Sequence, residues 1–306
     1  MASLATSGFS LPNHLVSGVW KKVLTLSAAA RLAGAEPQQF GIQQYMTLTA
    51  APKAEVVGEG AQKGYSNPTF TPVNAVARKV QITQRFNEEV QWADEDRQLG
   101  VLTTMQELSA TALSRALDLI AFHGINPLTG IALSGSPTKL LDTTNSVEVT
   151  TTSTPDADIE AAVGLIISDD LVPSGIALSP AYAYSYATQR DTQKRLLHPE
   201  AGFGQDVTSV GGLAAAVSST VSAPEATISG GAYATTNPNV KAIIGDWSAF
   251  RWGVQRSIPI EVIRYGDPDG QGDLKRSNQI ALRAEVVYGI GILSTDAFAK
   301  IIDASA

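Results

Sequence analysis

The sequence predicts an α+β protein in which helices and strands follow one another without a fixed order. A long helical pattern covers about residues 97–123, and period-2 strand patterns occur at residues 76–86 and 280–287. Two further helices and several short apolar strands alternate irregularly over residues 154–263, unlike the regular alternation of a doubly wound sheet. The mixed order therefore favours α+β, and no internal repeat is visible.

The first 44 residues contain little that could fold alone. They carry one short helical pattern, at residues 16–32, and too few apolar side chains to offset the chain entropy lost on ordering. We therefore expect residues 1–44 to form an arm that lies on another surface.

Residues 45–90 are expected to form one long hairpin. Strands are predicted near residues 46–48 and 54–57, followed by a glycine-rich tip and a half-buried strand. The apolar side chains of that last strand share one parity, with Arg78 as the exception: Val76, Val80, Ile82 and Phe86. Because a lone hairpin is only marginally stable, its apolar face needs a partner surface.

Three helices are predicted from periodicity and capping. The longest, at residues 97–123, would be roughly 40 Å long at 1.5 Å per residue and should end at Gly124. We interpret His123 as a cation-capable cap at its negative end rather than a catalytic residue. Shorter helices should begin after the N-caps Thr154 and Ser179, each of which is followed by proline. Strands are expected at residues 176–178, 214–217, 240–244, 258–263 and 280–287.

Composition describes a folded, cysteine-free and acidic chain. The 306 residues are 44 % hydrophobic and 17 % charged, unlike disordered proteins. The absence of cysteine excludes disulfides and thiolate sites, and fits a reducing cytoplasm. The net charge of −7 disfavours a surface built to grip phosphate, so only weak, non-specific contact with nucleic acid is expected. Neither a signal peptide nor a membrane span is predicted, so no membrane partner is expected.

No catalytic, cofactor or metal site is predicted, and we do not expect an enzyme. The three histidines have no metal-ligand spacing, and nucleotide-binding and serine-hydrolase motifs do not occur. A hydrolase that uses Asp and Glu lacks a convergent set of residues. In the glycine-aspartate run at residues 266–273, Asp267 and Asp269 are spaced as calcium ligands, but Asn278 replaces the required twelfth-position glutamate. A solvated turn is the expected structure there.

Several segments together resemble tailed-phage major capsid proteins, most closely those of phages that infect actinobacteria. The resemblance rests on Val57-Gly-Glu-Gly-Ala-Gln-Lys63, the strand at residues 80–86, the helix that ends in Ala-Phe-His-Gly124, Ile243-Ile-Gly-Asp-Trp247 and Gln279-Ile-Ala-Leu-Arg-Ala-Glu285. Each short motif is common, but their order and spacing across nearly the whole chain are specific.

The resemblance implies the Hong Kong 97-type phage capsid fold. It assigns residues 1–44 to the N-terminal arm and 45–90 to the extended E-loop hairpin. Residues 91–134 form the first part of the P domain, with its long spine helix, and 276–306 form the second part, with the closing strand. Residues 135–275 form the A domain. The E-loop tip then supplies candidate contacts between subunits (Gly58, Glu59, Gly60, Lys63 and Gly64), and a loop near the capsomer axis supplies Asp267, Asp269 and Asp273.

The implied function is self-assembly into pentamers and hexamers of an icosahedral shell that encloses the phage dsDNA genome. Expected partners are further copies of the chain and a portal protein, with a separate scaffolding protein and a decoration protein as further candidates. The shell would belong to the virion and be assembled in the bacterial host cytoplasm. An encapsulin-type nanocompartment shell is the alternative. A lysine–asparagine cross-link through Lys63 is not expected, because no asparagine follows Asn278.

Overall fold

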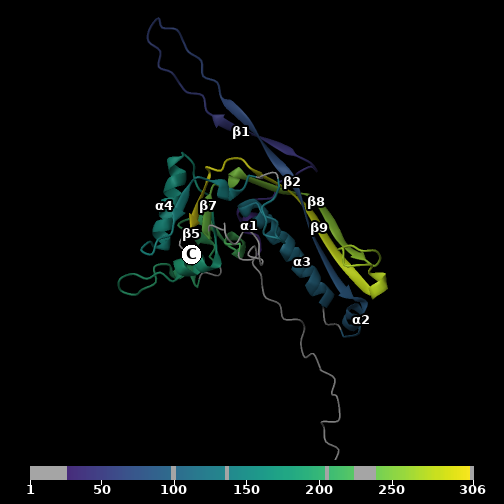
Figure 1. Ribbon diagram of the computed structural model, residues 1–306. Coiled ribbons are helices and arrows are strands. Elements are labelled where there is room, and N and C mark those ends of the chain that lie inside the picture. Colours follow the sequence, from purple (N-terminus) through teal and green to yellow (C-terminus); the bar gives the residue numbers. More distant parts are fainter. Residues whose placement is uncertain (1–25, 98–100, 135–137, 204–206, 224–238, 304–306) are drawn as a thin grey trace, which may run out of the picture.

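The computed structural model describes residues 26–97, 101–134, 138–203, 207–223 and 239–303. Two β-sheets lie side by side, and a hairpin projects from one of them far beyond the rest of the molecule (Figure 1). The predicted mixture of helices and strands is confirmed. Among the described helices, none is both long enough and apolar enough to cross a bilayer.

The first sheet has four antiparallel strands in the order β1-β2-β9-β8. Its central pair is long: β2 and β9 stay in register from Val76 opposite Ile290 to Asn87 opposite Gln279. The period-2 pattern at residues 76–86 is therefore confirmed as a strand. The strands are β1 (Gln43–Ala50), β2 (Thr69–Asn87), β8 (Phe250–Ile263) and β9 (Gln279–Ile292).

The long helical pattern is confirmed as a helix that lies along one face of this sheet (Figure 1). Helix α2 (Glu88–Arg97) precedes it, and α3 (Val101–Asp118) continues into a π-helical turn (Leu119–His123). Leu117 packs with Val286 and Tyr288 of β9, and the Tyr288 hydroxyl donates to the Leu113 carbonyl at 3.0 Å. The helix ends where predicted, at Gly124, whose φ of 65° suits a residue without a β-carbon.

The interpretation of His123 as a charged cap is wrong. Its side chain is buried, and Nε2 lies 3.0 Å from the Thr220 carbonyl and 3.1 Å from the Val221 carbonyl. Burial lowers the pKa of His123 to about 4, so the ring is neutral near pH 7. His123 therefore ties the helix end to residues 220–221 as a neutral donor.

The second sheet has six strands in the order β3-β10-β7-β4-β6-β5. Helices α4 (Pro155–Ser168) and α5 (Pro180–Ala187) pack on it through a core that includes Ile159, Ile166, Ile176 and Ile244. Both predicted N-caps are confirmed, because Thr154 and Ser179 accept from the backbone amides three residues later. The strands are β3 (Ser146–Glu148), β4 (Gly175–Leu178), β5 (Ser209–Val210), β6 (Leu213–Val217), β7 (Val240–Gly245) and β10 (Phe298–Ile302).

The two sheets do not follow the expected domain boundaries. Residues 135–275 contribute β3 to β7 to the six-stranded sheet but β8 to the four-stranded sheet. The final segment, residues 276–306, likewise contributes β9 to one sheet and β10 to the other. The division of the chain into arm, E-loop, P domain and A domain at the expected boundaries therefore stays a prediction.

A buried carboxylate joins the start of the described chain to the long helix. Helix α1 (Ala28–Leu32) is the described part of the helical pattern at residues 16–32; residues 16–25 lie outside the described residues. The carboxylate of Asp118 accepts from Ser27 Oγ at 2.5 Å, from the Ala28 and Ala29 amides at 2.7 and 3.0 Å, and from Thr220 Oγ1 at 2.5 Å. Burial raises the pKa of Asp118, although all four hydrogen bonds act to lower it.

Candidate assembly surfaces

The projecting hairpin has a paired stalk and an unpaired tip. In the stalk, β1 pairs with the first part of β2, from Gln43 opposite Ala75 to Ala50 opposite Thr69. The expected long hairpin is thus present, but the strand predicted at residues 54–57 is wrong, because residues 51–68 form no strand. We define the stalk as residues 43–50 and 69–75, and the tip as residues 51–68.

Three hydrogen bonds hold the two legs of the tip together. The Lys53 amide donates to Ser66 Oγ at 2.8 Å, and the Gly64 amide donates to Glu55 Oε2 at 2.8 Å. At the far end, the Ala61 amide donates to the Gly58 carbonyl at 3.1 Å. A gap of 660 Å³ lies between the legs. Few contacts within the subunit therefore hold the tip in shape.

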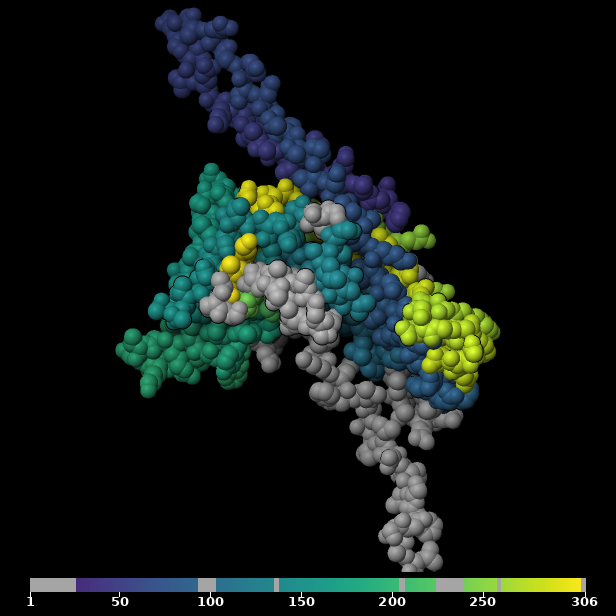
Figure 2. Space-filling model, viewed as in Figure 1, coloured from purple at the N-terminus to yellow at the C-terminus, as the bar shows by residue number. Residues whose placement is uncertain are grey.

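The five predicted contact residues lie in this tip. Gly58, Glu59, Gly60, Lys63 and Gly64 are all exposed, and the space-filling view shows the hairpin standing clear of the rest of the subunit (Figure 2). Gly60 has a φ of 78°, which suits glycine at the turn. Whether these residues touch another subunit stays a prediction.

One face of the stalk is apolar and exposed. Met46 is opposite Pro72 and Leu48 is opposite Phe70, so the four side chains lie on the same face of the two-stranded ribbon. Met46, Leu48 and Phe70 are 65, 49 and 55 % exposed, and Pro72 is also exposed. We call this group the stalk face. Sequence reasoning missed its extent, although the spacing of Met46 and Leu48 by two residues pointed to it.

The base of the hairpin is fixed by residues 34–42, which cross strands β8 and β9. The Glu36 amide donates to the Trp252 carbonyl at 2.8 Å, and Trp252 Nε1 donates to the Ala33 carbonyl at 2.9 Å. The crossing passes over Gly253 and Gly289, which face each other on β8 and β9. A β-carbon at Gly253 would overlap the Glu36 carbonyl oxygen, so the close approach requires glycine there.

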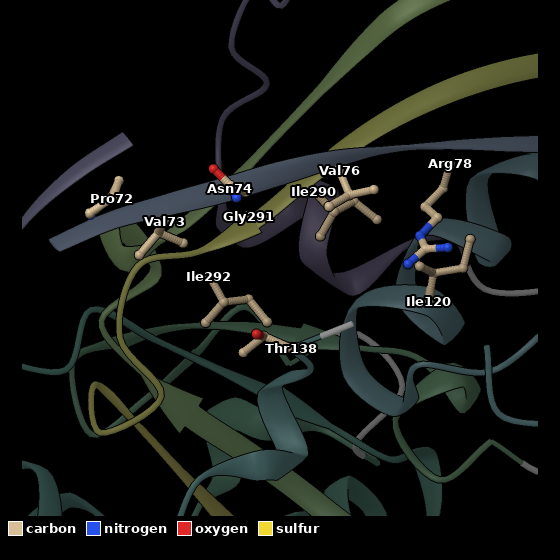
Figure 3. A pocket seen from close by; sticks show the side chains of 10 residues that line it. All are labelled: Pro72, Val73, Asn74, Val76, Arg78, Ile120, Thr138, Ile290, Gly291 and Ile292. Carbon is tan, nitrogen blue, oxygen red and sulfur yellow. The ribbon is translucent and has the colours of Figure 1, made fainter. Parts of the chain in front are cut away.

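Three adjoining crevices follow strand β2. The first, of 370 Å³, separates β2 and the end of β9 from Ile120 and Thr138, and Arg78 points at Ile120 inside it (Figure 3). The next two, of 410 and 450 Å³, continue along β2 beside residues 126–133 and α3. Arg78, the exception in the strand pattern, thus lines two of these crevices. Within the described residues, no group of three or more His, Asp or Glu side chains could hold a metal ion.

The glycine-aspartate run forms the loop between β8 and β9, at the end of the four-stranded sheet beside α2 (Figure 1). Arg85 of β2 fills the space between its acidic side chains. The guanidinium donates to Asp269 through Nε at 3.0 Å and through Nη2, to Asp267 Oδ1 at 3.3 Å, and to the Gly272 carbonyl at 2.8 Å. Asp273 instead accepts from the Arg276 amide at 3.0 Å. Sequence reasoning missed Arg85, because it lies more than 180 residues from the loop in the chain.

The location of this loop can be compared with the expectation that it lies near the capsomer axis. Asp267, Asp269 and Asp273 do not belong to the six-stranded sheet, to which most of residues 135–275 contribute. Their position relative to a capsomer axis depends on the assembly and stays a prediction. The expected solvated turn is confirmed, because all of residues 266–273 except Pro268 are exposed, and Arg85 organises it.

Replacing Arg85 with lysine is expected to loosen this loop. An ammonium group cannot reproduce the forked contacts to Asp269 and the loop carbonyls. Because hydrogen bonds from Arg85 are the main reason that the pKa of Asp269 is lowered, that pKa should rise toward its ordinary value in the variant. Carboxyl NMR titration and amide hydrogen exchange of residues 266–273 would measure both effects. Lys79→Arg, at another ion pair of β2, is the control, and an unchanged Asp269 pKa in Arg85→Lys would contradict the prediction.

Comparison with known proteins decides the family. A family model described as the phage capsid family matches residues 7–302. The chain belongs to the phage capsid family. A solved chain from Mycobacterium phage Ogopogo is 61 % identical, with a TM-score of 0.93 and coverage of 99 % of this chain and 100 % of that chain. A chain from Gordonia phage Cozz is 29 % identical, with a TM-score of 0.82 and coverage of 97 and 92 %.

A more distant capsid structure shares the fold. A structure titled "Capsid of native GTA particle computed with C5 symmetry" is 12 % identical, with a TM-score of 0.64 and coverage of 99 and 100 %. No curated protein sequence matches the chain. The Hong Kong 97-type fold expected from the sequence is consistent with these structures.

Membership of the phage capsid family identifies the kind of protein. The chain is a major capsid protein, a structural component of the virion that self-assembles into oligomers. The expected resemblance to capsids of actinobacteria-infecting phages is confirmed by the similarity to the Mycobacterium and Gordonia phage chains. The encapsulin alternative has no support beyond the shared capsid-like fold.

Proposed function

We propose that this phage capsid protein builds hexamers and pentamers of an icosahedral shell around the phage dsDNA, and that its hairpin binds a neighbouring subunit. The observation that carries the proposal is the stalk face, which is apolar, exposed and part of the hairpin that projects from its own subunit (Figure 2). Exposed apolar faces of this kind mark protein interaction sites. Since capsid subunits self-assemble, a second copy is the partner that this face fits.

The energetics favour many simultaneous contacts. Fully burying a large apolar side chain contributes about 1.5–3 kcal/mol, so Met46, Leu48 and Phe70 together contribute at most about 9 kcal/mol. Association costs about 4–15 kcal/mol in lost translational and rotational freedom. One hairpin is therefore a weak tether, whereas a closed ring in which every subunit gives and receives a hairpin is stable. Weak single contacts let wrongly placed subunits dissociate before the ring closes.

The remaining partners belong to the same proposal. A portal protein would occupy one vertex of the shell, and a separate scaffolding protein or a decoration protein would assist or reinforce it. The net charge of −7 supports weak, non-specific contact with the packaged dsDNA. Assembly would take place in the bacterial host cytoplasm, and the protein would act without catalysis or a cofactor.

Deleting residues 58–64 tests the role of the hairpin. We expect a folded, soluble subunit that fails to form closed shells, because the tip makes no contact with either sheet core. Circular dichroism would report folding and negative-stain electron microscopy would report shells. Normal shells from this deletion would contradict the proposal.

A double variant tests the contribution of the stalk face to assembly independently of the tip. Leu48→Ser with Phe70→Ser removes the apolar face, and it should reduce shell yield at least tenfold while leaving the fold intact. Thr49→Ala is the matched control, because Thr49 lies on the opposite face of β1 and binds only the Thr71 hydroxyl, at 2.7 Å. Equal shell yields from the two would show that the stalk face is not an interface.

A further inference from the structure

A loop of the six-stranded part is held at its neck by one histidine. Residues 188–203 leave the end of α5 and extend away from the sheet (Figure 1). Near the end of this loop, His198 stacks on Tyr186 of α5, with ring centroids 4.1 Å apart and an interplanar angle of 15°. His198 Nε2 lies 2.9 and 3.1 Å from the carboxylate oxygens of Asp156, in the first turn of α4.

Asp156 holds both ends of the neck. With the Gln189 amide oriented so that its nitrogen faces the carboxylate, that nitrogen lies 2.9 Å from Asp156 Oδ2. Gln189 opens the loop and His198 closes it, and the Leu197 amide also donates to the Gln189 carbonyl at 3.0 Å. The Asp156 carboxylate on α4 therefore contacts both ends of the loop, at Gln189 and at His198.

The tip of the loop is organised separately. Asp191 accepts from the Gln193 and Arg195 amides at 2.8 and 2.9 Å and pairs with Arg195 Nε at 2.8 Å. The bond from the Arg195 amide is the largest cause that lowers the pKa of Asp191. Asp191 therefore stays ionised well below neutral pH, and the tip does not change its charge in the range in which histidines titrate.

The surroundings of His198 change when its ring takes up a proton. In the neutral ring, Nε2–H donates to Asp156 and Nδ1 accepts from the Tyr186 hydroxyl at 3.2 Å. Glu200 Oε1 lies 3.4 Å from the same Nδ1. A protonated ring would donate from both nitrogens, to Asp156 on one side and to Glu200 on the other. Such charge-assisted hydrogen bonds are stronger than neutral ones.

We propose that His198 is a proton-operated clamp that ties the loop of residues 188–203 to α4 and tightens when the ring is protonated. The ionisable groups that face it are Asp156 of α4, Tyr186 of α5 and Glu200 of its own segment. Tyr182 lies one helical turn before Tyr186, and its hydroxyl contacts Asp158, two positions after Asp156. Burial, and then the charges of Asp156 and Glu200, raise the pKa of Tyr186, so its hydroxyl keeps its proton throughout.

The clamp controls a surface that other molecules can reach. Leu196, Leu197 and Phe203 are exposed on the loop, and Phe203 is 78 % exposed. A tightened clamp holds these side chains in one arrangement, whereas a loosened clamp lets them vary. The exposed loop would accordingly be most ordered in mildly acidic solution.

Amide hydrogen exchange of the full chain tests this clamp. After correction for the intrinsic pH dependence of exchange, protection of residues 189–198 should rise about fivefold between about pH 8 and about pH 5.5. In His198→Gln, which keeps a donor toward Asp156 but cannot gain a proton, protection should not change with pH. Glu200→Gln should keep the protection seen at pH 8 and lose part of the gain at pH 5.5, because the bond from His198 to Asp156 remains.

Two results would overturn the clamp. The first is the same pH-dependent gain in His198→Gln as in the parent chain, and the second is a parent chain whose loop protection does not respond to pH. Peptides from β7, which lies in the sheet core, provide the internal reference in every sample. His123 does not interfere, because its pKa of about 4 lies below the measured range.

Discussion

Replacing Asp118 with alanine is expected to lower the free energy of unfolding by about 3–5 kcal/mol. The change leaves the buried amides of Ala28 and Ala29 without an acceptor and removes the shared partner of Ser27 and Thr220. Each buried donor left without a partner costs about 1–3 kcal/mol. Urea denaturation would measure the loss, and exchange of the Ala28 and Ala29 amides would show that helix α1 detaches first.

The pH dependence of Asp118 gives a second readout of the same prediction. Because burial raises its pKa, the folded chain keeps a proton that the unfolded chain releases at a lower pH. The folded state then binds more protons, so this group makes stability fall as pH rises from about 3.8 through the raised pKa. Asp118→Asn should lack this component. Thr111→Ala, on the same helix, is the control and should change stability by less than about 0.5 kcal/mol.

Replacing Gly253 with alanine is expected to lower the free energy of unfolding by about 2–3 kcal/mol. The new methyl group would overlap the backbone carbonyl of Glu36, which cannot rotate away as a side chain can. Residues 34–42 would have to lift off the sheet, which breaks the Glu36 amide bond to Trp252. Thermal unfolding would measure the loss, and faster exchange of the Glu36 amide would locate it.

Gly289→Ala is the matched control for Gly253. These two glycines face each other across β8 and β9, but the three atoms nearest a β-carbon at Gly289 all belong to the side-chain amides of Gln38 and Gln255. Since flexible side chains can move aside, this variant should cost about 1 kcal/mol or less. Equal losses from the two variants would show that the close approach of the Glu36 backbone does not determine the stability of the crossing.

Elements that are determined by neighbouring residues in the chain could be predicted from the sequence. Thr154 and Ser179 are followed by proline and an apolar periodic run, and each begins a helix in the structure. Gly124 ends the long helix because a left-handed residue is required there. The alternation in β2 likewise reflects a sheet with one face against the helix, so a period of two was visible in the residues themselves.

Residues whose roles come from distant parts of the chain were not predictable in this way. Asp118 sits among apolar residues like an ordinary helix residue, and its partners Ser27 and Thr220 are 91 and 102 positions away. Arg85 and the loop that it organises are 184 positions apart. The charged interpretation of His123 failed because the residues that bury it cannot be read from its neighbours. Of the candidate assembly surfaces, the glycine-rich tip could be predicted from the sequence. Of the stalk face, only the spacing of Met46 and Leu48 was a signal.

The order of the strands also sets the timing of folding during synthesis. Strand β9 lies between β2 and β8, and β10 lies between β3 and β7, so residues 279–302 complete both sheets. Strand β2 ends at residue 87 and must wait for 192 further residues before β9 begins. At about 5–20 residues per second this delay is roughly 10–40 s. Neither sheet can be complete until synthesis has passed residue 302, so the nascent chain cannot join a growing shell before that point.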